Sequence, residues 1–176
     1  MSQNISDFYR VAQERDFARK FQFRLYQLGP VTMNEDDFVY VTTAALPGRE
    51  ITNVPTPFMG LDFNVPGTAK YPGSAGYKVQ FRCDAAYNIR NVLEQAQINT
   101  FDDATSTGDY NIGTADSIIS LMLMDKTNTP IKNYQLIGAY VQAIGESTYE
   151  IGDSGQIQTI DVTLAYHYWR AINITA

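Results

Sequence analysis

The last long stretch of the chain, Gly155 to Arg170, constrains the fold more than any other. Its sequence, GQIQTIDVTLAYHYWR, alternates with a period of two, as a half-buried strand requires. Five apolar or aromatic residues fall on one side of this pattern: Ile160, Val162, Leu164, Tyr166 and Tyr168. A strand at the end of the chain pairs with strands made much earlier. We therefore expect a sheet that joins distant parts of the sequence.

Several earlier segments have the same character. The alternation of apolar and polar residues, together with β-branched and aromatic content, predicts strands over 17–28, 38–46, 77–84 and 131–145, the last with a bulge near Gly138. A continuous apolar run, Ser117 to Asp125, predicts a strand that is covered on both faces. Its apolar part is far too short to span a bilayer. With six or seven strands, the predicted fold is mainly β, a β-sandwich or small barrel with flanking helices.

Two helices are predicted beside the strands. Near the N-terminus, Ile5, Phe8, Tyr9 and Ala12 are spaced as on one face of a short helix, with Ser2 or Asn4 as its cap. This helix is too short to be stable alone, so it must dock on its own sheet or on a neighbouring subunit. The main helix is expected at about 85–98, capped by Asp84 and packed on the sheet through the side chains of Ile89, Val92, Leu93 and Ala96.

The segment from Pro47 to Gly76 differs from the rest of the chain. It holds five prolines and five glycines, which predicts an irregular loop rather than a long regular element. It also carries large apolar side chains whose exposure to water is unfavourable: Ile51, Val54, Phe58, Met59, Leu61, Phe63 and Val65. We expect the segment to pack on a partner. The alternative is a loop folded back over its own core, with a short hairpin around Phe58 to Val65.

The sequence contains few residues suited to catalysis. The chain has one histidine and one cysteine, which are too few for a four-ligand zinc site built by the protein alone or for an internal disulfide. His167 lies in the last strand without an evident nucleophile, and Cys83 falls on an apolar strand face. The net charge of −6 argues against a protein that binds nucleic acid through a basic field. We predict a protein that is not an enzyme, has no cofactor, and works by contact with other proteins.

Five blocks of the sequence together resemble the tail tube protein of contractile-tailed bacteriophages of the T-even-like myophage family. They occur in this order along the chain: Asp16 to Leu25, Ala45 to Gly48, Val54 to Gly67, Tyr77 to Asp84, and Gln156 to Trp169. The last two blocks, Tyr77 to Asp84 and Gln156 to Trp169, are the most specific. The chain departs from the family in its longer N-terminal helix and in the acidic loop over 100–113.

The resemblance implies a single tail tube domain over 1–176 that forms hexameric rings, with sheets joined across subunits. Rings stack into a tube inside the sheath, and the long loop at about 47–76 reaches the adjacent ring. The partners implied are further copies of the chain, the sheath protein, and baseplate and tail terminator proteins. The protein would be made in the host cytoplasm and would reside in the virion tail. DNA would pass through an acidic lumen without specific binding, which fits the negative net charge.

The resemblance also suggests where the contacts between subunits lie. We expect the inter-ring stacking loop to use Ile51, Val54, Pro55, Pro57, Phe58 and Met59, and the sheet strand between subunits to use Ile160, Val162, Leu164 and Tyr166. Two alternatives stay open. One is a tube subunit or tube initiator of a related contractile injection machine. The other is a soluble β-sandwich module that binds a small ligand through its tyrosines.

Overall fold

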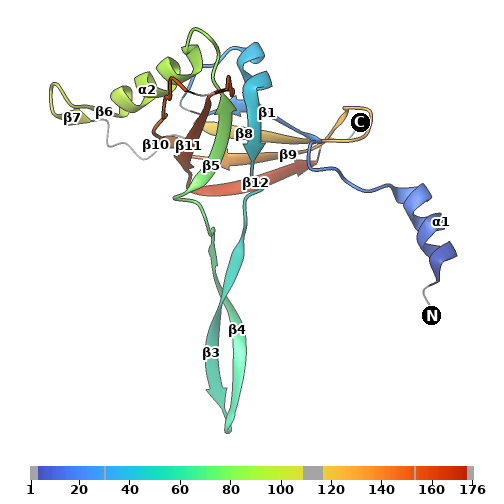
Figure 1. Ribbon diagram of the computed structural model, residues 1–176. Coiled ribbons are helices and arrows are strands. Elements are labelled where there is room, and N and C mark those ends of the chain that lie inside the picture. Colours follow the sequence, from blue (N-terminus) through green and yellow to red (C-terminus); the bar gives the residue numbers. More distant parts are fainter. Residues whose placement is uncertain (1–3, 30, 109–116, 153, 174–176) are drawn as a thin grey trace.

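Two four-stranded antiparallel sheets form the body of the protein (Figure 1). The computed structural model describes residues 4–29, 31–108, 117–152 and 154–173. The strands of the first sheet are, in spatial order, β1 (Phe23–Leu28), β8 (Ile118–Met124), β9 (Pro130–Ile137) and β12 (Tyr168–Asn173). Those of the second are β10 (Tyr140–Ile144), β11 (Thr159–Ala165), β5 (Tyr77–Arg82) and β2 (Val41–Ala44). The mainly β fold with flanking helices is thus confirmed.

The core lies between the two sheets and is built from alternate residues. In β5, Tyr77, Val79 and Phe81 are buried and the residues between them face outward, as predicted. In β11, which pairs with β5 over Thr159–Leu164, Ile160, Val162 and Leu164 are buried in the same way. The predicted pairing of the last long stretch with a much earlier strand is therefore confirmed.

The main helix, α2 (Asn88–Thr100), lies at one end of the body, beside β10. It buries Ile89, Leu93 and Ala96 in the core. Asp84 accepts hydrogen bonds from the backbone N–H groups of Asn88 and Ile89, at 3.1 and 3.4 Å, so its predicted capping role is confirmed. A small hairpin of β6 (Phe101–Asp102) and β7 (Thr107–Gly108) follows. The rest of the predicted acidic loop, beyond residue 108, lies outside the described residues.

Two stretches predicted as single strands instead bend and cross from one sheet to the other. The C-terminal stretch divides into β11 and β12, and the segment over 131–145 divides into β9 and β10. The two bends are neighbours, because Tyr140 pairs with Ala165 and Ile137 pairs with Tyr168. The prediction of unbroken strands was wrong, since both sheets face one core and an alternating pattern continues across the bend. What changes after the bend is which residues of the alternating pattern face inward. Tyr168, predicted to face inward, is exposed, whereas the Trp169 side chain packs against the core.

The bend between β9 and β10 depends on a glycine. Gly138 has a positive φ of 69°, and the His167 imidazole lies where a Cβ at this position would stand. The His167 N–H donates to the Ile137 carbonyl at 2.9 Å, which fixes the second bend against the first. His167 is thus a structural residue of the crossing.

Two of the early predicted strands are shorter than expected. The first begins at Phe23 rather than at residue 17, and its register shifts between Leu25 and Gln27. The second begins with a 3₁₀ helix, η1 (Glu35–Tyr40), before the short β2. The Asn34 N–H donates to the Asp37 carboxylate at 3.0 Å, and this local bond stabilises the helical turn against the extended conformation.

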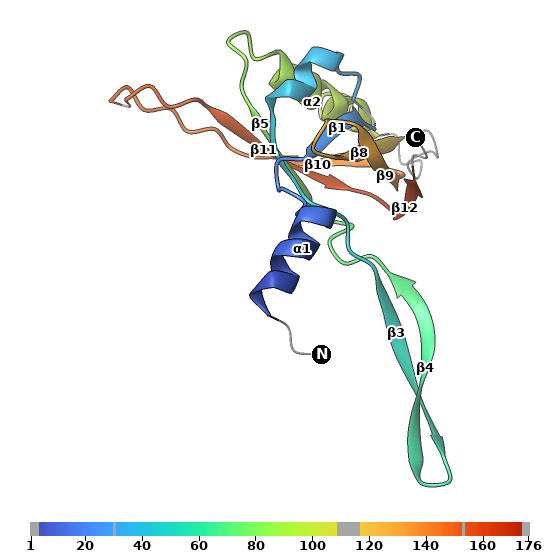
Figure 2. The ribbon, with the colours of Figure 1, turned by 90° about the vertical axis from the view of Figure 1, so that its right-hand side faces the viewer.

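The N-terminal helix, α1 (Ile5–Arg15), extends away from the body (Figures 1 and 2). Asn4 caps it, since its side-chain oxygen accepts the Asp7 N–H at 2.9 Å. None of its residues is buried, so it does not dock on its own sheet, and docking on a neighbouring subunit stays a prediction. In the described part of the chain, neither this helix nor any other combines the length and apolar character of a membrane span.

We expect Gly138→Ala to lower the free energy of unfolding by at least about 2 kcal/mol, because the left-handed backbone and the His167 ring both oppose a methyl group. Gly73→Ala is the matched control, since Gly73 has φ of 80° but open space around it. It should cost only about 1 kcal/mol. Urea denaturation measures the free energy of unfolding of both variants. Equal decreases for Gly138→Ala and Gly73→Ala would show that His167 does not constrain the bend.

Candidate protein–protein interface

The segment over 47–76 forms a long hairpin that projects from the body (Figures 1 and 2). Its strands are β3 (Glu50–Phe58) and β4 (Leu61–Lys70), which within the described residues pair only with each other. Every residue of the two strands is exposed except Thr52, which is half-buried. The prediction of an irregular loop was therefore wrong, and so was the alternative of a loop folded over its own core. The short hairpin that this alternative placed around Phe58 to Val65 is present, as the outer part of the longer hairpin. The large apolar side chains do lie outside the core.

The register explains how a regular hairpin accommodates its prolines. A two-residue turn makes Phe58–Leu61 a hydrogen-bonded pair, after which non-hydrogen-bonded and hydrogen-bonded pairs alternate. Pro57, Pro55 and Pro66 all fall on non-hydrogen-bonded pairs, where the backbone nitrogen faces outward. Their missing N–H groups remove no bond between the strands. They also prevent a further strand from pairing fully along either edge.

The same register gives the hairpin one apolar face. Because paired residues share a face, this face carries Val54, Phe58, Leu61, Phe63 and Val65. The opposite face carries Asn53, Pro55, Pro57, Asp62, Asn64 and Pro66. The predicted stacking residues are thus divided: Val54 and Phe58 lie on the apolar face, whereas Pro55 and Pro57 lie on the other. The three apolar residues of β4 were missing from that predicted set, although their alternation in LDFNV was a signal for them.

The tip of the hairpin has an unusual backbone. Met59 and Gly60 both have positive φ, 48° and 79°, as a type I′ turn requires. Methionine is a poor residue for the left-handed region, and asparagine or glycine normally occupies such a site. The Met59 side chain is nevertheless 88% exposed. Because its backbone is strained and its apolar side chain lies in solvent at the tip of the hairpin, Met59 is a candidate contact residue.

The base of the hairpin is held to the body by two aromatic side chains. The Tyr77 hydroxyl donates to the Ala45 carbonyl at 2.7 Å, and the Trp169 indole N–H donates to the Gly48 carbonyl at 2.8 Å. Burial, and the neighbouring Tyr166, raise the pKa of Tyr77 well above its ordinary value, so its hydroxyl stays protonated and keeps donating. Ile51, the remaining predicted stacking residue, lies just beyond this base.

The second predicted set of contact residues is in a different environment. Ile160, Val162, Leu164 and Tyr166 are all at most 4% exposed and belong to the core. Moreover, β11 is bonded to β10 on one side and to β5 on the other. The expectation that this strand joins subunits was therefore wrong, since neither its edges nor these side chains are accessible. The outer strands of the two sheets are β1, β12, β10 and β2.

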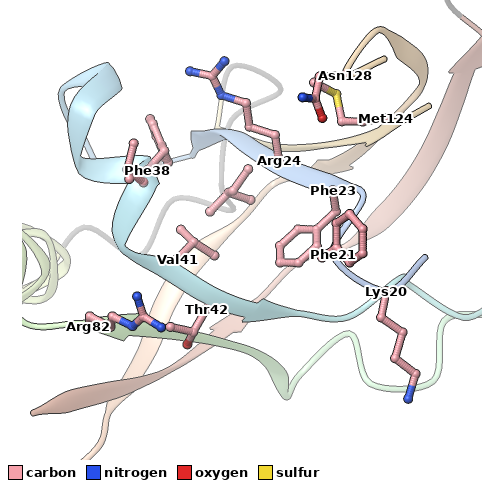
Figure 3. Close-up of a pocket in the computed structure, with 12 residues that line it drawn as sticks. Lys20, Phe21, Phe23, Arg24, Phe38, Val41, Thr42, Arg82, Met124 and Asn128 are labelled. Atoms are coloured by element: carbon pink, nitrogen blue, oxygen red, sulfur yellow. The ribbon is translucent and has the colours of Figure 1, made fainter. Parts of the chain in front are cut away.

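A cleft of about 780 Å³ opens between the outer strands β1 and β2 (Figure 3). Figure 3 shows the rings of Phe21 and Phe23 within it, with cationic side chains around them. It is lined by Lys20, Phe21, Phe23, Arg24, Leu25, Phe38, Val39, Val41, Thr42, Arg82, Met124 and Asn128. This lining contains three cations and no carboxylate. The cleft and the hairpin are thus two separate apolar surfaces on one chain.

The described residues hold no arrangement typical of catalysis. They contain no cluster of three or more histidine, cysteine or acidic side chains that could hold a metal ion. Cys83 is half-buried against the core, and burial raises the pKa of its thiol, which disfavours the reactive thiolate. Asp102 accepts hydrogen bonds from the Ala104 N–H and the Thr105 hydroxyl, both at 2.9 Å, and closes a turn.

Comparison with solved structures gives the class of the fold. The chain superposes on a protein of the anti-feeding prophage cap, described as the tube-terminating cap, with a TM-score of 0.63 over 91% of this chain and 93% of the other, at 12% identity. It also superposes on a chain of the sheath–tube complex of PVC, an extracellular contractile injection system, with a TM-score of 0.56 over 98% and 100%, at 12% identity. The fold is one that contractile injection systems use.

Comparison of sequences is more specific. The chain is 26% identical to the tail tube protein gp19 of Enterobacteria phage T4 over 169 residues, which covers 94% of this chain and 98% of the phage protein. No family model matches the chain. The resemblance to the tail tube proteins of contractile-tailed phages is thereby confirmed.

We expect Met59→Asn to stabilise the hairpin in the unassembled protein and to weaken the contacts of the hairpin with other subunits. Asn-Gly is the preferred type I′ pair, and relief of the methionine strain by about 1 kcal/mol should slow amide exchange in β3 and β4 about fivefold. Hydrogen exchange of the dilute protein measures this. Thr56→Asn, a change within β3, serves as the control and should give no such protection. Faster exchange in Met59→Asn would contradict the strain assignment.

Proposed function

We propose that the chain is the structural subunit of the inner tail tube of a contractile phage tail. It polymerises as stacked hexameric rings inside the sheath, and the tube conducts DNA into the host upon contraction. The similarity to the phage T4 tail tube protein over nearly the whole of both chains supports this role, as does a fold found in contractile injection systems. A tail tube protein is a structural component rather than an enzyme, and its place is the virion tail.

The exposed hairpin is the observation that carries the proposal. A two-stranded hairpin without a third layer is marginally stable at best in water, yet this one spans residues 50–70 with nearly all side chains in solvent. Its apolar face would be an aggregation hazard on a protein that worked as a monomer. Covering that face with the next ring removes both problems. The stacking residues we now propose are Val54, Phe58, Met59, Leu61, Phe63 and Val65.

Lateral contacts within a ring would use the outer strands rather than β11. In the part of the chain that the structure describes, β1, β12, β10 and β2 each have one edge that pairs with no other strand, and these edges are available for pairing between subunits. The exposed aromatic side chains of α1, Phe8 and Tyr9, offer a further contact with a neighbour, as does Phe17, whose ring stacks on Phe8 with the centroids 6.0 Å apart. Sheath, baseplate and terminator proteins remain the proposed external partners.

The acidic lumen also remains a proposal. Asp161 is the acidic residue that lies exposed on the outer face of a central strand, whereas Asp36, Asp37, Asp102 and Asp103 belong to η1 and to the small hairpin after α2. A lumen that repels phosphate would let DNA slide through without binding. The same fold occurs in a tube-terminating cap, so a tube subunit or initiator of a related contractile machine is the second candidate.

Phe58→Asp should abolish tube formation while leaving the body folded. The charge falls on the apolar face, where burial against another subunit would require desolvation of a carboxylate, but in the monomer it stays in water. Stability should therefore change by less than about 0.5 kcal/mol. The measurement is negative-stain electron microscopy at increasing concentration, with preformed baseplates added as templates.

Asn64→Asp is the matched control, because Asn64 lies on the opposite face of the same hairpin. It should leave the tubes intact. Normal tubes from Phe58→Asp would overturn the stacking role of the apolar face. A wild-type protein that stays monomeric even with baseplates would overturn the tube assignment.

A further inference from the structure

We propose that the cleft between β1 and β2 receives the tip of the β3–β4 hairpin from a second copy of this chain. The inference rests on the proposed function and goes further, since it names the surface on which the hairpin stacks. The two surfaces are the cleft lined by Phe21, Phe23, Val41 and their neighbours, and the tip formed by Phe58 to Asp62.

The cleft exists because the two sheets are not closed at this edge. The first sheet ends at β1 and the second at β2, and no pairing joins these strands within the described chain. Aromatic and aliphatic side chains consequently line a space of about 780 Å³ that this chain leaves open. At its mouth, Phe21 and Val39 are 75% and 77% exposed. Such a surface is typical of a binding groove rather than of a sealed core.

The charges of the two surfaces are complementary. The cleft carries Lys20, Arg24 and Arg82, and none of these takes part in the ion pairs found among the described residues. The hairpin beyond its base, residues 51–69, has a single ionisable side chain, Asp62. Asp62 stands next to the tip, on the face opposite Phe58 and Leu61. An inserted tip can therefore place apolar side chains against the phenylalanines and its carboxylate near the cations.

The hairpin cannot occupy the cleft of its own chain. At about 3.3 Å per residue, the nine residues of β3 carry the tip ~30 Å from the base. Figures 1 and 2 show the hairpin directed away from the body in both views. A projection and a recess at different places on one subunit form a heterologous contact, which repeats without limit along a tube.

The N-terminal helix is the competing occupant, and its charges argue against it. Within α1, Asp7 and Glu14 are balanced by Arg10 and Arg15, and Arg10 already pairs with Glu14 at 3.4 Å. A neutral helix gains little from a cationic cleft. The hairpin carries one carboxylate near its tip, Asp62, which takes part in none of the ion pairs among the described residues, and it is the better fit.

Disulfide trapping tests the contact directly. In a background of Cys83→Ser, one protein carries Met59→Cys and a second carries Val39→Cys, and the two are mixed under oxidising conditions that permit tube growth. We expect a covalent heterodimer. Ile98→Cys replaces Val39→Cys in the control, since Ile98 is 51% exposed on α2, away from the cleft, and it should give at least tenfold less product.

Three outcomes would overturn the inference: wild-type tubes without the Met59–Val39 cross-link, equal cross-linking to Ile98→Cys, or cross-linking of Phe8→Cys to Val39→Cys, which would place α1 in the cleft. A wild-type protein that forms no tubes would instead contradict the proposed function. The two failures are therefore distinguishable in one set of samples.

Charge exchange provides a second, independent readout. Asp62→Lys and Arg24→Glu should each raise the concentration needed for tube growth at least tenfold, and the double variant should restore growth toward the wild type. Asp62→Lys combined with Lys78→Glu is the control, because Lys78 lies outside the cleft, on the outer face of β5, and it should give no restoration. Growth of both single variants at the wild-type concentration would contradict the contact.

Discussion

The pairing of β11 with β5, and the continuation of the same segment into β12, are what the rest of the structure depends on. Thr159–Leu164 pairs with Tyr77–Arg82, and Tyr168–Asn173 pairs with β9 in the other sheet. One C-terminal segment thereby holds the two sheets together around a common core. The neighbouring bend at Gly138 does the same for β9 and β10. Because these contacts join residues far apart in sequence, the body must form largely as one unit.

A body stabilised in this way can carry elements that contribute nothing to its own core. The hairpin is anchored only at its base, by Tyr77 and Trp169, and α1 buries none of its residues. Both elements expose apolar side chains that a monomer gains nothing from displaying. Under the proposed function, these conformations serve contacts with other subunits, since a tube subunit must be stable before assembly and must bind its neighbours during it.

Residue patterns predicted much of the body, since alternation and helical spacing follow directly from which side chains meet the core. The inward residues of β5, the buried face of α2 and the Asp84 cap were all predicted correctly. The bends at Gly138 and Tyr166 were not predicted, because a segment that passes from one sheet to the other around a common core still alternates between apolar and polar residues. A glycine with positive φ leaves no signature that separates a bulge from a crossing.

The hairpin shows a different limit. The prolines predict an irregular loop, but Pro55, Pro57 and Pro66 all occupy pairs where no N–H is needed. These positions depend on a register that the turn at Met59–Gly60 sets. The sequence could not predict the central position of β11 in its sheet either. A strand in the middle of one chain's sheet and a strand that joins two chains show the same alternation of apolar and polar residues. The cleft depends on two sheet edges that are distant in sequence, and no local pattern revealed it.

We infer that the β3–β4 hairpin becomes stably structured through contact with another subunit. Hydrogen exchange resolved to the amides of residues 50–70, compared between dilute monomer and assembled tubes, tests it most directly. We predict fast exchange in the monomer and strong protection in the tube, while β5 and β11 are protected equally in both. Equal exchange of the hairpin in the two states would show that it makes no contact between subunits and would contradict the account.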